Sequence, residues 1–135
     1  MNREPFEPSP YLNELSHNVV GAAIEVHRHL GPGFLEIAYE RAMRLELTAR
    51  GIGYTTQREI PIIYRDEQVA TARLDLLIEN ELVVEIKSLE SIHAIHAKQL
   101  LSYLRAGGFQ LGLILNFNVP VLRDGVKRLV NSIYL

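Results

Sequence analysis

The chain has 135 residues, no cysteine and a formal net charge of −2. We expect residues 1–135 to form one domain with a substantial core, with residues 1–10 as an extended N-terminal arm. The lack of cysteine excludes disulfides, thiolate metal sites and a cysteine nucleophile. No apolar run is long enough to cross a membrane, so we expect a cytoplasmic protein.

The charge is unevenly distributed along the chain. Residues 98–135 contain five basic residues and one acidic residue, whereas residues 1–97 contain nine basic and fifteen acidic residues. A basic C-terminal third is compatible with contact to a nucleic-acid backbone, although many solvated surfaces have the same composition.

The first element is a predicted helix, in which apolar residues recur at helical spacing from Leu12 to Leu30. Ser9 is suited to be its N-cap and Pro10 to be its first residue. Gly31-Pro32-Gly33 must end it, because proline lacks a donor and glycine permits unusual dihedral angles. We assign surface or packing roles to the three histidines on or near this helix: His17, His27 and His29.

A second helix is predicted from about Leu35 to Arg50, ended by Gly51. Most of its buried side is expected to come from Leu35, Ala38, Ala42, Leu45 and Leu47. Another face carries Glu36, Tyr39, Glu40 and Met43. On its own, Glu36 is most simply a first-turn acid that complements the helix dipole.

Three strands follow, at about residues 54–64, 69–78 and 82–88, each with the alternation typical of β structure. Pro61 suggests an edge position or a bulge for the first of them. In the third, Val84 and Ile86 should face one way, and Glu85 and Lys87 the other.

The loop between the second and third strands decides whether two carboxylates meet. A three-residue loop centred on Asn80 pairs residue 78 with 82 and therefore Asp75 with Glu85, with Arg73 opposite Lys87. A two-residue loop would instead place Asp75 on the other face of the sheet. We favour the three-residue loop, or a bulge with the same effect.

Residues 92–106 predict a third helix, ended by Gly107-Gly108. A buried strand parallel to a neighbour is expected at residues 111–115, and a final strand or short helix at 126–133. The element order predicts an α/β sandwich around a mixed sheet. The helix should bury Leu100, Leu101 and Leu104, with His96, Gln99 and Tyr103 in a separate polar stripe; His93 and His96 are expected to be structural.

Five short segments of the sequence resemble a known family. Residues 33–39, GFLEIAY, match the signature of the GxxExxY protein family, which belongs to the PD-(D/E)xK nuclease superfamily. The likeness continues at residues 73–75, 84–87, 99–104 and 115–117, and spans about residues 12–130. It implies a restriction-endonuclease-like fold with an αβββαβ core and a mixed central sheet flanked by helices.

The resemblance also implies roles for individual residues. Asp75 and Glu85 match the metal-binding acids and Lys87 the active-site lysine. Glu36 matches an acid that the first core helix often supplies to the metal. Leu74 stands where the motif has proline, which contributes no ligand. Substrate-binding or supporting roles fall to Gln99 and Tyr103, and Tyr39 is either a packing or a supporting residue.

The expected activity is that of a metal-dependent endo- or exonuclease acting on DNA, with Mg²⁺ or Mn²⁺ held by carboxylate oxygens. The alternative is a catalytically inactive nucleic-acid-binding or protein-interaction module on the same fold. A hydrolase of another phosphate-containing substrate is a third possibility, because no base-reading element is visible. Without the other motifs, Asp75 and Glu85-x-Lys87 would be read as an exposed cross-strand salt bridge. A domain of this size has little surface with which to hold a DNA duplex. We therefore expect a homodimer, which would provide two sites for two strands.

Overall fold

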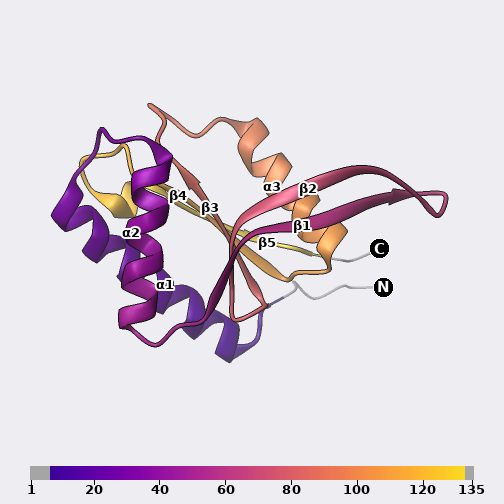
Figure 1. Ribbon diagram of the computed structural model, residues 1–135, viewed down its shortest axis with the longest axis horizontal. Coiled ribbons are helices and arrows are strands. Elements are labelled where there is room, and N and C mark those ends of the chain that lie inside the picture. The colour runs from indigo at the N-terminus through magenta and orange to yellow at the C-terminus, as the bar shows by residue number, and fades with distance from the viewer. Residues whose placement is uncertain (1–6, 133–135) are drawn as a thin grey trace.

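The computed structural model describes residues 7–132 and contains three α-helices and a five-stranded sheet (Figure 1). Strand order is β1-β2-β3-β4-β5, with β3 and β4 parallel and the other neighbours antiparallel. The predicted mixed sheet flanked by helices is confirmed. The elements are α1 (Pro10–Leu30), α2 (Glu36–Ala49), β1 (Tyr54–Tyr64), β2 (Glu67–Ile78), β3 (Leu82–Lys87), α3 (Ala94–Gly107), β4 (Leu111–Asn116), the 3₁₀ turn η1 (Leu122–Gly125) and β5 (Val126–Val130).

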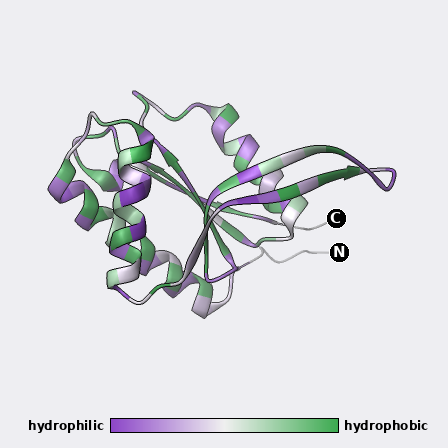
Figure 2. Cartoon of the chain, in the orientation of Figure 1, coloured by the Kyte–Doolittle hydropathy of each residue, from purple (hydrophilic) through white to green (hydrophobic). Residues whose placement is uncertain are grey.

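The sheet separates two apolar cores. Val84 and Ile86 of β3 belong to the core that α1 and α2 cover, as the alternation predicted. Val83 belongs to the core beneath α3, together with Leu100 and Leu104. Apolar segments accordingly follow the strands and the inward sides of the helices (Figure 2). Burial of both faces explains why β3 and β4 are almost continuously apolar.

The start and end of α1 agree with the sequence prediction. The Ser9 hydroxyl accepts a hydrogen bond from the Leu12 amide at 3.1 Å, and Pro10 is the first helical residue. Gly31 ends the helix with a φ of 69°. Residues 1–6 of the expected N-terminal arm lie outside the described residues. Within residues 7–132, no helix is both long enough and apolar enough to cross a membrane.

The histidines of α1 have packing or surface positions, as expected. His27 is buried, and its Nε2 donates to the Val119 carbonyl oxygen at 2.8 Å. His29 lies on the surface, with its Nε2 2.8 Å from a carboxylate oxygen of Glu25. His17 is exposed.

The predicted buried side of α2 is wrong for two leucines. Leu35 and Leu45 are each 74% exposed, and the buried residues are Tyr39, Met43 and Leu47. This helix has apolar residues on more than one side, so periodicity alone did not select the side that packs. The Tyr39 ring stacks on Phe117, with centroids 4.5 Å apart, and this contact fixes the orientation of the helix.

The hairpin of β1 and β2 extends well beyond the rest of the sheet (Figure 1). Pro61 lies on the edge strand β1, as predicted, and a bulge follows between Ile62 and Ile63. The turn uses Arg65 and Asp66, which have φ values of 48° and 64°. Two successive residues with positive φ are typical of the tight hairpin turn whose twist matches that of the strands.

The C-terminal half also agrees with expectation. Helix α3 ends at Gly107, and Gly108 follows in the left-handed conformation with a φ of 73°. Strand β4 is buried throughout and parallel to β3. The last element is a strand, β5, rather than a helix, and the expected end at residue 133 lies outside the described residues.

We predict that Tyr39→Phe lowers the free energy of unfolding by about 1–3 kcal/mol, because the substitution removes the partner of two partly buried hydrogen-bonding groups. The Tyr39 hydroxyl donates to the Gly31 carbonyl oxygen at 2.6 Å and accepts from the Phe34 amide at 3.1 Å. Urea denaturation measures the effect, with Tyr11→Phe as the control because Tyr11 is 55% exposed. Equal losses in the two variants would contradict the bridging role of the hydroxyl.

Candidate active site

The loop between β2 and β3 has the predicted length. Ile78 pairs with Leu82, and the register continues to the pair of Leu76 and Val84. Glu79 and Asn80 in the loop have φ values of 50° and 60°. The three-residue loop is therefore confirmed, and its register directs Asp75 toward Glu85.

Beyond Leu76 and Val84 the two strands stop pairing directly, and carboxylates take over the hydrogen bonds. The Asp75 amide donates to Glu85 Oε1 at 3.2 Å, and the Ile86 amide donates to Asp75 Oδ2 at 2.9 Å. Each carboxylate thus reaches the backbone of the opposite strand. These reciprocal bonds hold Asp75 and Glu85 together where the sheet opens.

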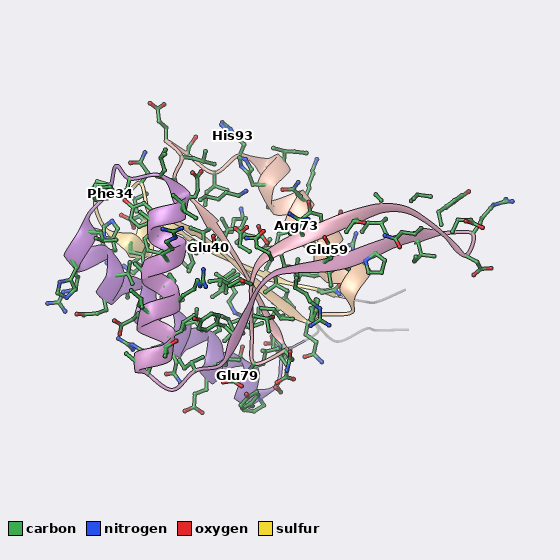
Figure 3. All side chains as sticks on the ribbon, viewed as in Figure 1. Phe34, Glu40, Glu59, Arg73, Glu79 and His93 are labelled. Atoms are coloured by element: carbon green, nitrogen blue, oxygen red, sulfur yellow. The ribbon has the colours of Figure 1, made fainter. Side chains whose placement is uncertain are left out.

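The expected neighbouring positions of Arg73 and Lys87 are wrong, because β2 and β3 no longer pair at that level. Arg73 instead lies opposite Glu59 on β1, and its NH2 is 2.9 Å from Glu59 Oε1 (Figure 3).

Strand β2 is also interrupted on its other side at Asp75. Its register partner on β1 would be Gln57, which is left out of the pairing between Thr56–Leu76 and Arg58–Leu74. Gln57 has a φ of 53°, a conformation that is costly for a residue other than glycine. Asp75 thus sits at a local distortion of both neighbouring pairings.

Burial changes the acidity of Glu85. Glu85 is only 8% exposed. Loss of solvent, and then the charge of Asp75, raise the pKa of Glu85 to about 8; the Asp75 amide and the charge of Lys87 act in the opposite direction. Near neutral pH the metal-free pair therefore retains a proton, which a bound cation would displace.

Tyr103 of α3 faces this pair from the neighbouring helix. Burial, followed by the negative charges of Glu85 and Asp75, raises the pKa of the Tyr103 hydroxyl. The phenol consequently stays protonated and able to donate. Gln99, one helical turn earlier, is exposed, and no hydrogen bond joins it to the carboxylates within the described residues.

The chain after Lys87 is held firmly in place. Lys87 is partly buried, and its carbonyl oxygen accepts from the Phe117 amide at 3.0 Å. The Ser88 hydroxyl donates to the Phe34 carbonyl oxygen at 2.5 Å. This bond places the start of α2 beside the end of β3, and Glu36 is the first residue of α2. Glu36 itself is exposed.

Glu40 is a candidate that the sequence analysis did not select. Its Oε1 accepts a hydrogen bond from Gln57 Nε2 at 3.2 Å, and Gln57 lies opposite Asp75. Glu40 is half-buried, on the side of α2 toward the sheet (Figure 3). It shares a helix face with Glu36, four residues earlier, and that spacing was its only signal in the sequence.

Tyr39 and the two histidines at the start of α3 have structural roles. Tyr39 is fully buried, and its hydroxyl bridges Gly31 and Phe34 rather than reaching the carboxylates. His93 and His96 cap the start of α3, where the His93 amide donates to His96 Nδ1 at 3.1 Å.

The donor set at Asp75 and Glu85 fits a hard divalent cation. Both residues offer carboxylate oxygens, and each already has one oxygen oriented by a backbone amide. Residues 7–132 contain no group of three or more histidine, aspartate or glutamate side chains placed to hold a metal. Mg²⁺ is commonly held by one or two carboxylates with water completing its shell, so a pair is sufficient.

An acid pair followed by Lys87, set where two strands of a helix-flanked mixed sheet diverge, defines a restriction-endonuclease-like protein. A family profile described as the PD-(D/E)XK nuclease superfamily matches residues 13–129. The chain belongs to this superfamily, which confirms the resemblance seen in the sequence. The narrower GxxExxY assignment stays a prediction. No curated protein matches the chain.

We predict that the metal-free protein becomes less stable as the pH rises from about 4.5 to about 8, by on the order of a few kcal/mol. The pKa of Glu85 is raised by folding from its ordinary 4.5 to about 8, so the folded state binds more protons than the unfolded state in this interval. Glu85→Gln should remove most of this dependence and be the more stable protein near pH 8.

Urea denaturation with a chelator present, repeated across this pH range, tests the prediction. Glu90→Gln is the matched control, because Glu90 is exposed and should leave the pH dependence unchanged. An undiminished slope in Glu85→Gln would show that the dependence comes from other groups.

Proposed function

We propose that this member of the nuclease superfamily is a single-domain, divalent-cation-dependent nuclease that hydrolyses phosphodiester bonds, with DNA as its principal substrate. The observation that carries the proposal is the meeting of Asp75 and Glu85 through reciprocal hydrogen bonds at the opening of the sheet. Buried carboxylates with a raised pKa are frequent at functional sites.

In this proposal Asp75 and Glu85 hold Mg²⁺ or Mn²⁺. Their hydrogen bonds to the Ile86 and Asp75 amides restrict rotation of both carboxylates, so little ordering remains to be done on binding. When bound, such a cation lowers the pKa of a water molecule and polarises a phosphoryl oxygen.

Lys87 would act on the phosphate or on the attacking water. It lies two residues after Glu85 on the same side of β3, and its backbone is fixed by Phe117. An ammonium group held there stabilises negative charge that develops on the phosphate. Tyr103 would donate a hydrogen bond from its protonated hydroxyl, and exposed Gln99 would contact the nucleic-acid backbone.

Helix α2 would supply a further carboxylate. In this proposal Glu40 moves to contact the cation once it binds, because Gln57, which donates to Glu40, lies opposite Asp75 in the register of β1 and β2. Without a cation, Glu40 does not form one group with Asp75 and Glu85 among the described residues. Glu36 would hold a cation-bound water at the mouth of the site, because it is exposed at the start of α2, near Ser88. The sequence analysis expected Glu36 to bind the metal directly, whereas this proposal gives it a contact through water.

The proposed working unit is a homodimer. One chain offers one pair of carboxylates, whereas a duplex has two strands to cut. A second copy would provide the second site and a larger surface for the duplex.

Cleavage assays with Mg²⁺ or Mn²⁺ on single-stranded, duplex and branched DNA test the activity. We expect Asp75→Asn and Lys87→Met each to lower the rate by at least about 100-fold, because each removes a charge used in the transition state. Glu59→Gln is the control, since the Glu59 side chain is 61% exposed and paired with Arg73 rather than with Asp75, Glu85 or Lys87. Equal rates in wild type and both site variants would contradict the assignment; bound but uncut DNA would favour the inactive binding module.

A second measurement separates the two acids of α2. We expect Glu40→Gln to weaken Mn²⁺ binding by about 10- to 100-fold in calorimetry, and Glu36→Gln to weaken it less. A larger loss of Mn²⁺ affinity in Glu36→Gln than in Glu40→Gln would assign the direct contact to Glu36. The two variants change the same chemical group on one helix, so each is the matched control of the other.

A further inference from the structure

A hollow lined by the end of α1 and by η1 contains neither Asp75 nor Glu85 in its lining. It has a volume of about 590 Å³ between the end of α1 and η1, and we call it the η1 groove. Arg28 and Arg123 contribute the charged part of its lining. Its other lining residues are largely apolar and include Ile24, Pro32, Pro120, Val121 and Leu122.

The groove presents apolar side chains to the surface. Ile24 is 40% exposed and Val121 is 52% exposed. Arg123 forms no ion pair within the described part of the chain, and Arg28 has only a 3.5 Å contact with Glu25. The groove therefore combines exposed apolar surface with positive charge, and suits an apolar segment that carries acids.

The end of the projecting hairpin has the complementary character. Residues 63–69 form what we call the arm tip, where Ile63, Tyr64 and Val69 are 56%, 61% and 60% exposed. Arg65, Asp66 and Glu67 lie between them in the turn. The Arg65 guanidinium lies 5.9 Å from the centroid of the Tyr64 ring, and the tip has a net charge of −1. Such a cluster of large apolar side chains at a projecting end is typical of an interaction site rather than of ordinary surface.

Two other uses of the arm are less well supported. Pro61 and the bulge after Ile62 disfavour pairing of the β1 edge with another strand. The hairpin between residues 57 and 73 has three basic and three acidic residues, and Arg73 is neutralised by Glu59. It therefore lacks the positive charge that binding to phosphates requires.

We propose that the arm tip of one chain docks in the η1 groove of a second copy. Tyr64 and its apolar neighbours would cover Ile24 and Val121, and Asp66 and Glu67 would face Arg28 and Arg123. The proposal rests on the homodimer proposed above but not on the nuclease chemistry.

The shape of the molecule allows this contact to close into a dimer. The arm tip and the η1 groove lie at opposite ends of the long axis, with η1 in yellow beside the end of α1 (Figure 1). A twofold axis perpendicular to the long axis therefore brings each tip to the other chain's groove, and the two contacts are identical. Formation of the first contact makes the second intramolecular, which strengthens the pair.

Light scattering on the full chain, coupled to size exclusion, tests the interface. We expect a dimer for wild type, and a dissociation constant raised by about tenfold or more in Tyr64→Ser, Glu67→Arg and Arg123→Glu. The double variant Glu67→Arg with Arg123→Glu should regain dimerisation, because the charges are exchanged rather than lost. Leu45→Ser is the control, since Leu45 is 74% exposed on α2 outside both surfaces.

A monomeric wild type would overturn both the interface and the homodimer. A dimer that all three single variants leave unchanged would overturn the interface alone. Tip variants that lose affinity for duplex DNA while staying dimeric would make the arm a nucleic-acid contact and reject the proposal. Unfolding curves equal to wild type are required of each variant. A wild-type dimer with no cleavage activity would support this interface and contradict the proposed chemistry.

Discussion

The structure depends on two hydrogen bonds that replace ordinary strand pairing at one level of the sheet. The amides of Asp75 and Ile86 each donate to a carboxylate of the opposite strand, so β2 and β3 separate without leaving these amides unsatisfied. A buried glutamate and a partly buried aspartate are thereby held together, where their negative charges disfavour each other. A bound divalent cation would neutralise this repulsion. Without a cation, protonation of Glu85 reduces it.

The surrounding structure keeps this opening in a fixed shape. Tyr39 joins Phe117 to the turn that precedes α2, and Phe34 in that turn accepts from Ser88. The end of β3 is held further by Asn116, which is buried and exchanges hydrogen bonds with the backbone of Leu89. The signature motif of residues 33–39 is thus partly a structural clamp that positions the first turn of α2 against the lysine strand.

The meeting of Asp75 and Glu85 was predictable because loop length fixes the register of a hairpin, and Asn80 tolerates the left-handed conformation that the loop uses. The packed side of α2 was not predictable, because apolar residues occur on several sides of the helix and Phe117, on which the Tyr39 ring stacks, comes from elsewhere in the chain. Gln57 gave no signal either, since a positive φ at a residue other than glycine is imposed by tertiary structure. Glu40 was missed because its hydrogen bond from Gln57, which joins residues 17 positions apart, also arises from tertiary structure.

The central claim is that Glu85, beside Asp75, keeps a proton that a cation displaces. Calorimetric titration with Mn²⁺ near pH 7, in two buffers with different ionisation enthalpies, measures it directly. With the pKa of Glu85 at about 8, wild type should release close to one proton for each ion bound, and Glu85→Gln should release almost none. Cation binding by wild type without proton release, or equal release by the variant, would contradict the account.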